Sequence, residues 1–103
     1  MDKEFQTLLR KLGVKEGSIP TVLDYYESKD SESLTKKISN IPAFQGIPSP
    51  MIVNSFGMYE PDFGSRYFTE DFPYGLRFLI ETAKGNYLIC PHMEKVYKWG
   101  KLY

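Results

Sequence analysis

Residues 65–76 read Ser65-Arg66-Tyr67-Phe68-Thr69-Glu70-Asp71-Phe72-Pro73-Tyr74-Gly75-Leu76 and follow a loop rich in proline and glycine. They open a segment with helical periodicity, and Pro73 sits where the first turn of that helix is expected. An arginine and two adjacent carboxylates beside a helix start can hold an anionic substrate or orient a catalytic group. They are equally the parts of a plain helix start with a salt bridge, and composition alone favours this second interpretation.

The segments on either side of this stretch are also helical in pattern. Apolar residues recur three and four positions apart, which predicts helices over residues 2–12, 18–28, 31–41, 73–84 and 90–99. Asp2, Ser18 and either Asp30 or Ser31 are the expected N-caps, with Gly13 and the Gly85-Asn86 pair as stop signals. We therefore expect an all-α fold of about five helices, in a single helical domain over residues 1–103.

Residues 42–64 break this pattern. Four prolines and three glycines punctuate the segment, and its apolar side chains argue against disorder. We expect an ordered, packed wrap around which the helices are arranged. Residues 51–56 resemble a short strand but lack alternation and an evident partner, so the predicted strand content is near zero.

Composition bounds the class of protein. The chain has 103 residues, a formal net charge of zero and no long apolar run, which predicts one soluble cytoplasmic domain without a nucleic-acid or membrane partner. Cys90 is the only cysteine, so an internal disulfide is excluded and a reducing compartment is expected.

Aromatic residues make up 16% of the chain, which is unusually high for its length. Aromatic side chains dominate both cores and interfaces. Two interpretations stay open from composition: a tyrosine-rich core, or an aromatic surface that contacts another molecule.

Several kinds of site are missing from the sequence. There is no GxGxxG or GxxxxGK[ST] motif, so we expect this chain to hold no nucleotide cofactor itself. Cys90 and His92 are too few for a zinc site and too close in sequence for a nucleophile–base pair, so we predict no metal and interpret Cys90-Pro91-His92 as a helix start. The remaining chemistry lies in Arg66, Glu70 and Asp71. Arg66 suits a carboxylate, and Asp71 suits a histidine N–H.

Residues 66–76 resemble the R-Y-x-T-E-D-x-P-x-G-L signature of the opine dehydrogenases, the octopine/nopaline dehydrogenase family. Two further segments agree in order and spacing: Asn40-Ile41-Pro42-Ala43-Phe44-Gln45-Gly46-Ile47-Pro48-Ser49-Pro50 before the signature, and Cys90-Pro91-His92-Met93-Glu94-Lys95-Val96-Tyr97-Lys98-Trp99 after it. The resemblance covers roughly Ser18 to the C-terminus.

The resemblance implies the function of a larger enzyme. Members combine a Rossmann domain that binds NAD(H) or NADP(H) with a helical substrate domain, and they reductively condense an α-keto acid with an amino acid. It implies a fold similar to part of the 6-phosphogluconate dehydrogenase C-terminal-like helical domain. By matching the signature, Asp71 takes the place of the catalytic aspartate, and Arg66 takes the place of the arginine that contacts the keto-acid carboxylate.

The chain also departs from the family pattern. The family's catalytic histidine has no match here, His92 does not align with it, and the Rossmann domain is absent. We therefore expect part of a helical domain that is inactive in isolation and completed by a Rossmann domain of the full-length enzyme or of a separate chain. The alternative is a stand-alone, non-enzymatic helical module that forms a homodimer through its aromatic surface. An in-frame strand–GxGxxG–helix pattern upstream would separate the first from the second.

Overall fold

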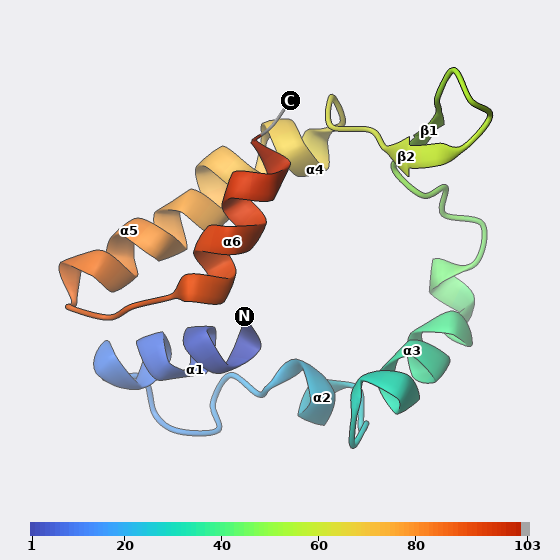
Figure 1. Ribbon diagram of the computed structural model, residues 1–103. Coiled ribbons are helices and arrows are strands. Elements are labelled where there is room, and N and C mark those ends of the chain that lie inside the picture. The colour runs from blue at the N-terminus through green and yellow to red at the C-terminus, as the bar shows by residue number, and fades with distance from the viewer. Residues whose placement is uncertain (102–103) are drawn as a thin grey trace. The chain divides into compact units, whose positions relative to one another are not determined.

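The computed structural model describes residues 1–101. The chain divides into two compact units, Asp2–Pro48 and the residues from Ser49 onward. The boundary falls inside the proline- and glycine-rich segment (Figure 1). Most of the regular structure is helical, which confirms the predicted all-α class, whereas the predicted single domain over residues 1–103 stays a prediction.

Helix α1 (Asp2–Lys11) opens the first unit and ends as its sequence predicts. Gly13 has a φ of +82°, and its N–H donates to the carbonyl of Arg10 at 3.1 Å while the Val14 N–H donates to Leu9 at 3.0 Å. These two bonds are a Schellman motif, which satisfies the last carbonyls of the helix. The sequence predicted Asp2 as the N-cap of this helix, and the structure corrects this. Asp2 is the first helical residue, and its carboxylate accepts the N–H of Val22 at 2.9 Å.

Helix α2 (Val22–Tyr25) is shorter than predicted and begins later. Thr21 is its N-cap and accepts the N–H of Asp24 at 3.1 Å, so the prediction of Ser18 as the cap is wrong. The reason is Pro20, which disfavours the helical conformation for the residue before it, Ile19. The Ser18 hydroxyl instead donates to the carbonyl of Lys15 at 2.6 Å.

Helix α3 (Ser31–Ser39) confirms the third predicted helix. Asp30 is its N-cap: its Oδ1 accepts the N–H of Ser33 at 2.8 Å, and the Ser33 hydroxyl accepts the N–H of Asp30 at 3.1 Å. This reciprocal pair is a capping box. A short 3₁₀ turn, Pro42–Phe44, follows where Pro42 was expected to end the helix.

The second unit starts with a hairpin that the sequence did not predict. Strands β1 (Met51–Val53) and β2 (Tyr59–Pro61) pair antiparallel, with Ile52 opposite Glu60. The side chain of Asn54 holds the turn by accepting the N–H groups of Phe56 and Met58 at 2.9 and 3.0 Å. The strand at residues 51–53 therefore has a partner, β2, which the sequence did not reveal.

The hairpin also corrects the expectation of a packed wrap. Its apolar side chains are exposed: Met51 46%, Ile52 46%, Val53 58%, Phe56 88%, Met58 65% and Tyr59 73%. A two-stranded hairpin has no second layer of its own to cover its faces, so its apolar residues stay accessible unless another element packs on them.

The signature stretch forms one nearly continuous helical segment. Helix α4 (Arg66–Thr69) leads into a π-helical turn, η2 (Asp71–Leu76), and then into α5 (Arg77–Gly85). Pro73 therefore lies inside the segment and not at its start, which corrects the sequence prediction. Proline has no N–H, and its ring crowds the carbonyl four residues earlier. The wider π turn accommodates it, with the Arg77 N–H donating to the carbonyl of Phe72.

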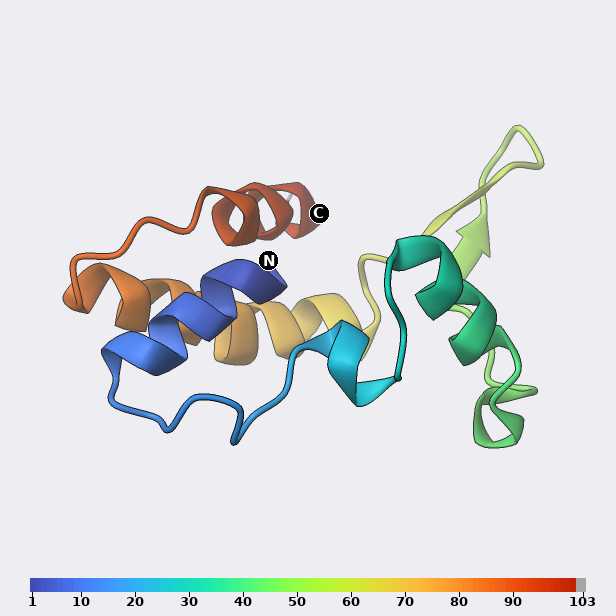
Figure 2. The ribbon, with the colours of Figure 1, turned by 90° about the horizontal axis from the view of Figure 1, so that it is seen from below.

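Helix α6 (Pro91–Gly100) completes the second unit and runs beside α5 (Figures 1 and 2). Cys90 is its N-cap residue and Pro91 its first helical residue, as predicted. Gly85 is the last residue of α5 and Asn86 is its C-cap, so the helix ends slightly later than predicted. The left-handed residue that follows is Tyr87, with a φ of +60°. The buried apolar core of this unit consists of Leu76, Ile80, Ala83, Cys90 and Met93.

Candidate functional site

Arg66 lies in the first turn of α4 and forms an ion pair with Glu70, one turn later. The Nη2 atom of Arg66 is 3.4 Å from Oε2 of Glu70, and the two side chains are 77% and 55% exposed. An exposed pair of this kind contributes about 0–1 kcal/mol. Glu70 therefore holds the guanidinium weakly, and a carboxylate from solution can replace it at little cost.

Asp71 begins the π-helical turn η2 and is exposed. It lines an open depression together with Glu70, Tyr74 and Gly75. Tyr74 is 80% exposed, so an apolar ring and two carboxylates meet at this surface. A carboxylate placed in this way can accept a hydrogen bond from a donor that approaches from outside the chain.

Arg66 and Asp71 thus belong to a single helical segment, on consecutive turns. The sequence placed them on either side of a turn into a helix, and the structure corrects this. His92 lies in the first turn of α6 and is not among the residues that line the depression around Asp71. The structure therefore pairs Arg66 with Glu70 and places Asp71 beside Glu70 in the open depression, while His92 lies on another helix.

A cluster of aromatic rings packs this segment against α6. Phe68 lies 4.7 Å from Phe63, 5.2 Å from Phe72 and 5.6 Å from Trp99, measured between ring centroids. Phe72 also stacks on Tyr97, with an interplanar angle of 23°. These rings join α4 and η2 to α6, so part of the aromatic surplus packs within this unit, where Phe68 and Phe72 are half-buried. Other rings are exposed, among them Tyr25, Phe56, Tyr74, Phe78 and Tyr87.

The sequence did not predict the π turn. It left open which residue pairs with Arg66, and the structure gives Glu70. The signal for the π turn was available, because the apolar pattern continues on the N-terminal side of Pro73 through Phe72 and Phe68. A proline within a longer helical run calls for a local widening of the helix.

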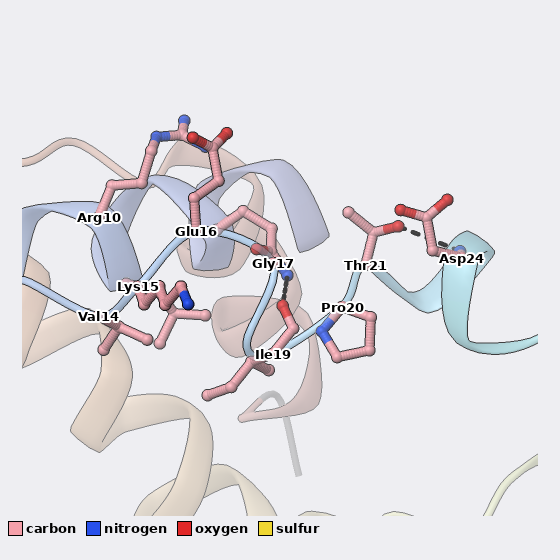
Figure 3. Close-up of a pocket in the computed structure, with 11 residues that line it drawn as sticks. Arg10, Val14, Lys15, Glu16, Gly17, Ile19, Pro20, Thr21 and Asp24 are labelled. Carbon is pink, nitrogen blue, oxygen red and sulfur yellow. Dashed lines mark hydrogen bonds between the residues drawn. The ribbon is translucent and has the colours of Figure 1, made fainter.

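A second hollow, of about 190 Å³, lies in the first unit between α1 and the loop that precedes α2 (Figure 3). Gln6 pins the loop by donating from Nε2 to the carbonyl of Ile19 at 3.2 Å. The lining mixes the cations of Arg10 and Lys15 with the carboxylates of Glu16 and Asp24. The two cations and two carboxylates balance in charge. We interpret this hollow as structural, formed where the Gln6 hydrogen bond holds the loop against α1.

Residues 1–101 offer neither a candidate metal site nor a candidate membrane span. No group of three or more His, Cys, Asp or Glu side chains within this range is arranged to hold a metal ion. No helix among the same residues has the length and apolar character needed to cross a membrane. Cys90 is buried at the start of α6.

Comparison with known proteins matches residues 1–103 to the family model described as "NAD/NADP octopine/nopaline dehydrogenase, alpha-helical domain". The chain is 32% identical to a tauropine dehydrogenase of Arabella iricolor over 70% of its own length. It is 34% identical to an opine dehydrogenase of Haliotis discus hannai over 69%, and 31% identical to an octopine dehydrogenase of Mizuhopecten yessoensis over 79%. The matched parts span only 18%, 18% and 22% of those relatives. No solved structure matches the chain significantly.

Proposed function

Because this chain belongs to the alpha-helical domain family of the NAD/NADP octopine/nopaline dehydrogenases, we propose that it is the substrate and catalytic helical domain of an NAD(P)-dependent opine dehydrogenase-like oxidoreductase. The whole enzyme would reductively condense an α-keto acid with an amino acid. The observation that carries this proposal is the placement of Arg66, Glu70 and Asp71 on consecutive exposed turns of one helical segment.

Arg66 is the proposed anchor for the keto-acid carboxylate. Its planar guanidinium presents two parallel N–H donors to a carboxylate. The ion pair with Glu70 keeps it poised at the surface, and the 3.4 Å separation and high exposure make that pair easy to exchange. Glu70 is then a stand-in for the ligand carboxylate when no keto acid is bound.

Asp71 is the proposed partner of a catalytic histidine that lies outside this chain. A carboxylate that accepts one imidazole N–H fixes the tautomer and orientation of the ring and stabilises its protonated form. The exposure of Asp71 in an open depression supports this role, because the histidine has to reach it from another domain. In this arrangement Asp71 holds the proton-transfer group in place.

The described residues do not fit a nicotinamide cofactor. Their only sheet is an antiparallel hairpin, and they contain no strand that leads through a glycine-rich turn into a helix. The cofactor, which supplies hydride when it is bound, would belong to a Rossmann domain of the full-length enzyme or of a separate chain. We propose that the isolated 103-residue chain is inactive for this reason, and that the enzyme is cytoplasmic.

A titration with pyruvate tests the assignment of Arg66. We expect the amide and guanidinium NMR signals of residues 66–75 to shift with pyruvate, and the shifts to disappear in Arg66→Gln. Arg10→Gln, which removes an exposed arginine of α1, is the matched control and should leave them unchanged. Pyruvate shifts of equal size in Arg66→Gln would exclude Arg66 as the anchor.

The second candidate is a non-enzymatic helical module that dimerises. The apolar hairpin favours it, because six of its side chains between Met51 and Tyr59 are 46–88% exposed. Sedimentation over a range of concentrations should then show a dimer that Phe56→Lys dissociates. A monomer at all concentrations would remove this alternative.

A further inference from the structure

The groove between α5 and α6 carries a concentration of positive charge that the proposed function does not use. It is lined by Arg77, Ile80, Glu81, Lys84, Glu94, Tyr97, Lys98 and Lys101, and encloses about 550 Å³. Four of these side chains are cations and two are carboxylates. The chain as a whole has a formal net charge of zero, so this groove holds a local excess of positive charge.

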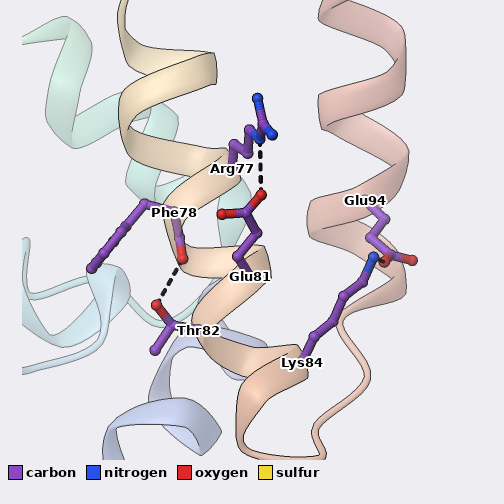
Figure 4. A network of polar contacts seen from close by, with 6 residues as sticks. All are labelled: Arg77, Phe78, Glu81, Thr82, Lys84 and Glu94. Carbon is purple, nitrogen blue, oxygen red and sulfur yellow. Dashed lines mark hydrogen bonds and ion pairs between the residues drawn. The ribbon is translucent and has the colours of Figure 1, made fainter.

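The two carboxylates of the groove are already engaged. Oε1 of Glu81 accepts from Nε of Arg77 at 2.9 Å, and Oε1 of Glu94 lies 3.1 Å from Nζ of Lys84 (Figure 4). The Lys84–Glu94 pair bridges α5 and α6 at the groove. Glu81 is bound through Nε, so its hydrogen bond does not use the terminal amino groups of Arg77.

Lys98 and Lys101 supply the excess charge on the α6 side. Within residues 1–101, no ion pair includes either of them. The Nζ atom of Lys101 lies 5.2 Å from the centroid of the Tyr97 ring, which holds this ammonium group at the groove. The Glu81 carboxylate, followed by Tyr97, raises the pKa of Arg77, so the guanidinium on the opposite wall stays charged.

We propose that this groove binds a small phosphate anion, of the class of phosphate monoesters and diphosphates, between Arg77 on α5 and Lys98 and Lys101 on α6. Phosphate oxygens accept several charge-assisted hydrogen bonds at once, which matches three cationic side chains that line one groove from two helices. A structural explanation also exists, because cations near the C-terminal end of a helix stabilise it. That explanation predicts stability without dependence on added anions.

Titration of the full chain with inorganic pyrophosphate tests the site, with sodium chloride holding the ionic strength constant. Binding stabilises the folded state, so we expect the thermal midpoint to rise by several degrees at about 10 mM pyrophosphate, with NMR shifts at residues 77 and 97–101. Citrate, a polycarboxylate, forms the second arm. A stronger response to citrate than to pyrophosphate would overturn the assignment to phosphate.

Charge-matched variants separate a site from general electrostatics. Lys98→Gln/Lys101→Gln should weaken pyrophosphate binding by about tenfold or more. Lys36→Gln/Lys37→Gln on α3 removes the same charge in the other unit and should leave the affinity unchanged. Equal losses in the two double variants, or no pyrophosphate response of the unmodified chain, would overturn the proposal. Neither variant touches Arg66 or Asp71, so the pyruvate titration decides the proposed function separately.

Discussion

Gly100, in the last turn of α6, lies directly against the ring of Phe72 in the π-helical turn. A Cβ atom at residue 100 would overlap three atoms of that ring. Phe72 contacts Phe68 and Tyr97 on its other sides, so the ring has little room to withdraw. The missing side chain at residue 100 is therefore what allows α6 to approach the turn that begins at Asp71.

Gly100→Ala should destabilise the chain by about 1–3 kcal/mol, because overpacking forces the ring of Phe72 or the end of α6 to move. Urea denaturation followed by circular dichroism measures this. Gly85→Ala is the control, since Gly85 is also helical but a Cβ there meets nothing within 4 Å. It should be neutral or stabilising by up to about 1 kcal/mol. A Gly100→Ala variant as stable as Gly85→Ala would contradict the contact.

Tyr87 occupies the left-handed region with a φ of +60°, and the residue is 94% exposed. Tyr87→Gly should raise the free energy of unfolding by about 0.5–1 kcal/mol, because glycine adopts this conformation without steric cost. Tyr87→Ala removes the same ring but keeps Cβ, so it should bring no such gain. If alanine stabilises as much as glycine, the ring and not the backbone is the source of the effect.

Local signals along the chain predicted the helices well and the connections poorly. Gly13 and Asp30 act within a few residues of themselves, so a glycine stop and a capping box are visible in sequence. Ser18 failed as a cap because the restriction that Pro20 places on Ile19 outweighed a side chain suited to capping. The hairpin was not predicted because Met51–Val53 and Tyr59–Pro61 show no alternation of apolar and polar residues. Their pairing depends instead on the turn that Asn54 holds.

The candidate site residues could be named from the signature, but their structural setting could not. Arg66 and Asp71 carry recognisable chemistry, whereas the π turn depends on how a helix absorbs Pro73 in its interior. The groove between α5 and α6 could not be predicted either, because its charges come from two helices whose contact is tertiary.

The N-cap of α3 should make stability depend on acid pH. The backbone N–H of Ser33, followed by its hydroxyl, lowers the pKa of Asp30 by hydrogen bonding to the charged carboxylate. A lowered folded pKa gives stability that is present above the ordinary aspartate value of about 3.9 and is lost as the pH falls through the folded value. Thermal midpoints should therefore fall less between about pH 6 and pH 2.5 in Asp30→Asn than in the unmodified chain. Identical falls would exclude this carboxylate as a contributor.

The purified 103-residue chain should show no NADH- or NADPH-dependent turnover of pyruvate with an amino acid. In the proposed mechanism, proton transfer needs a histidine partner for Asp71, and the described residues form no dinucleotide site. Absorbance at the reduced-cofactor band measures this, with an active opine dehydrogenase added afterwards to show that the assay responds. Turnover that scales with the concentration of the chain and disappears in Asp71→Asn would overturn the prediction of inactivity.

Glu70→Gln should strengthen the binding of pyruvate to the chain, a prediction that depends on the proposed role of Arg66. The Glu70 carboxylate occupies Arg66 at 3.4 Å, and an incoming carboxylate has to displace it. An exposed pair is worth at most about 1 kcal/mol, so the gain in affinity should be about fivefold or less. The guanidinium signal of Arg66 reports it. Glu81→Gln breaks a second pair of the same spacing, Arg77–Glu81, and should leave that signal unchanged. Weaker pyruvate binding in Glu70→Gln would instead show that Glu70 positions Arg66 for its ligand.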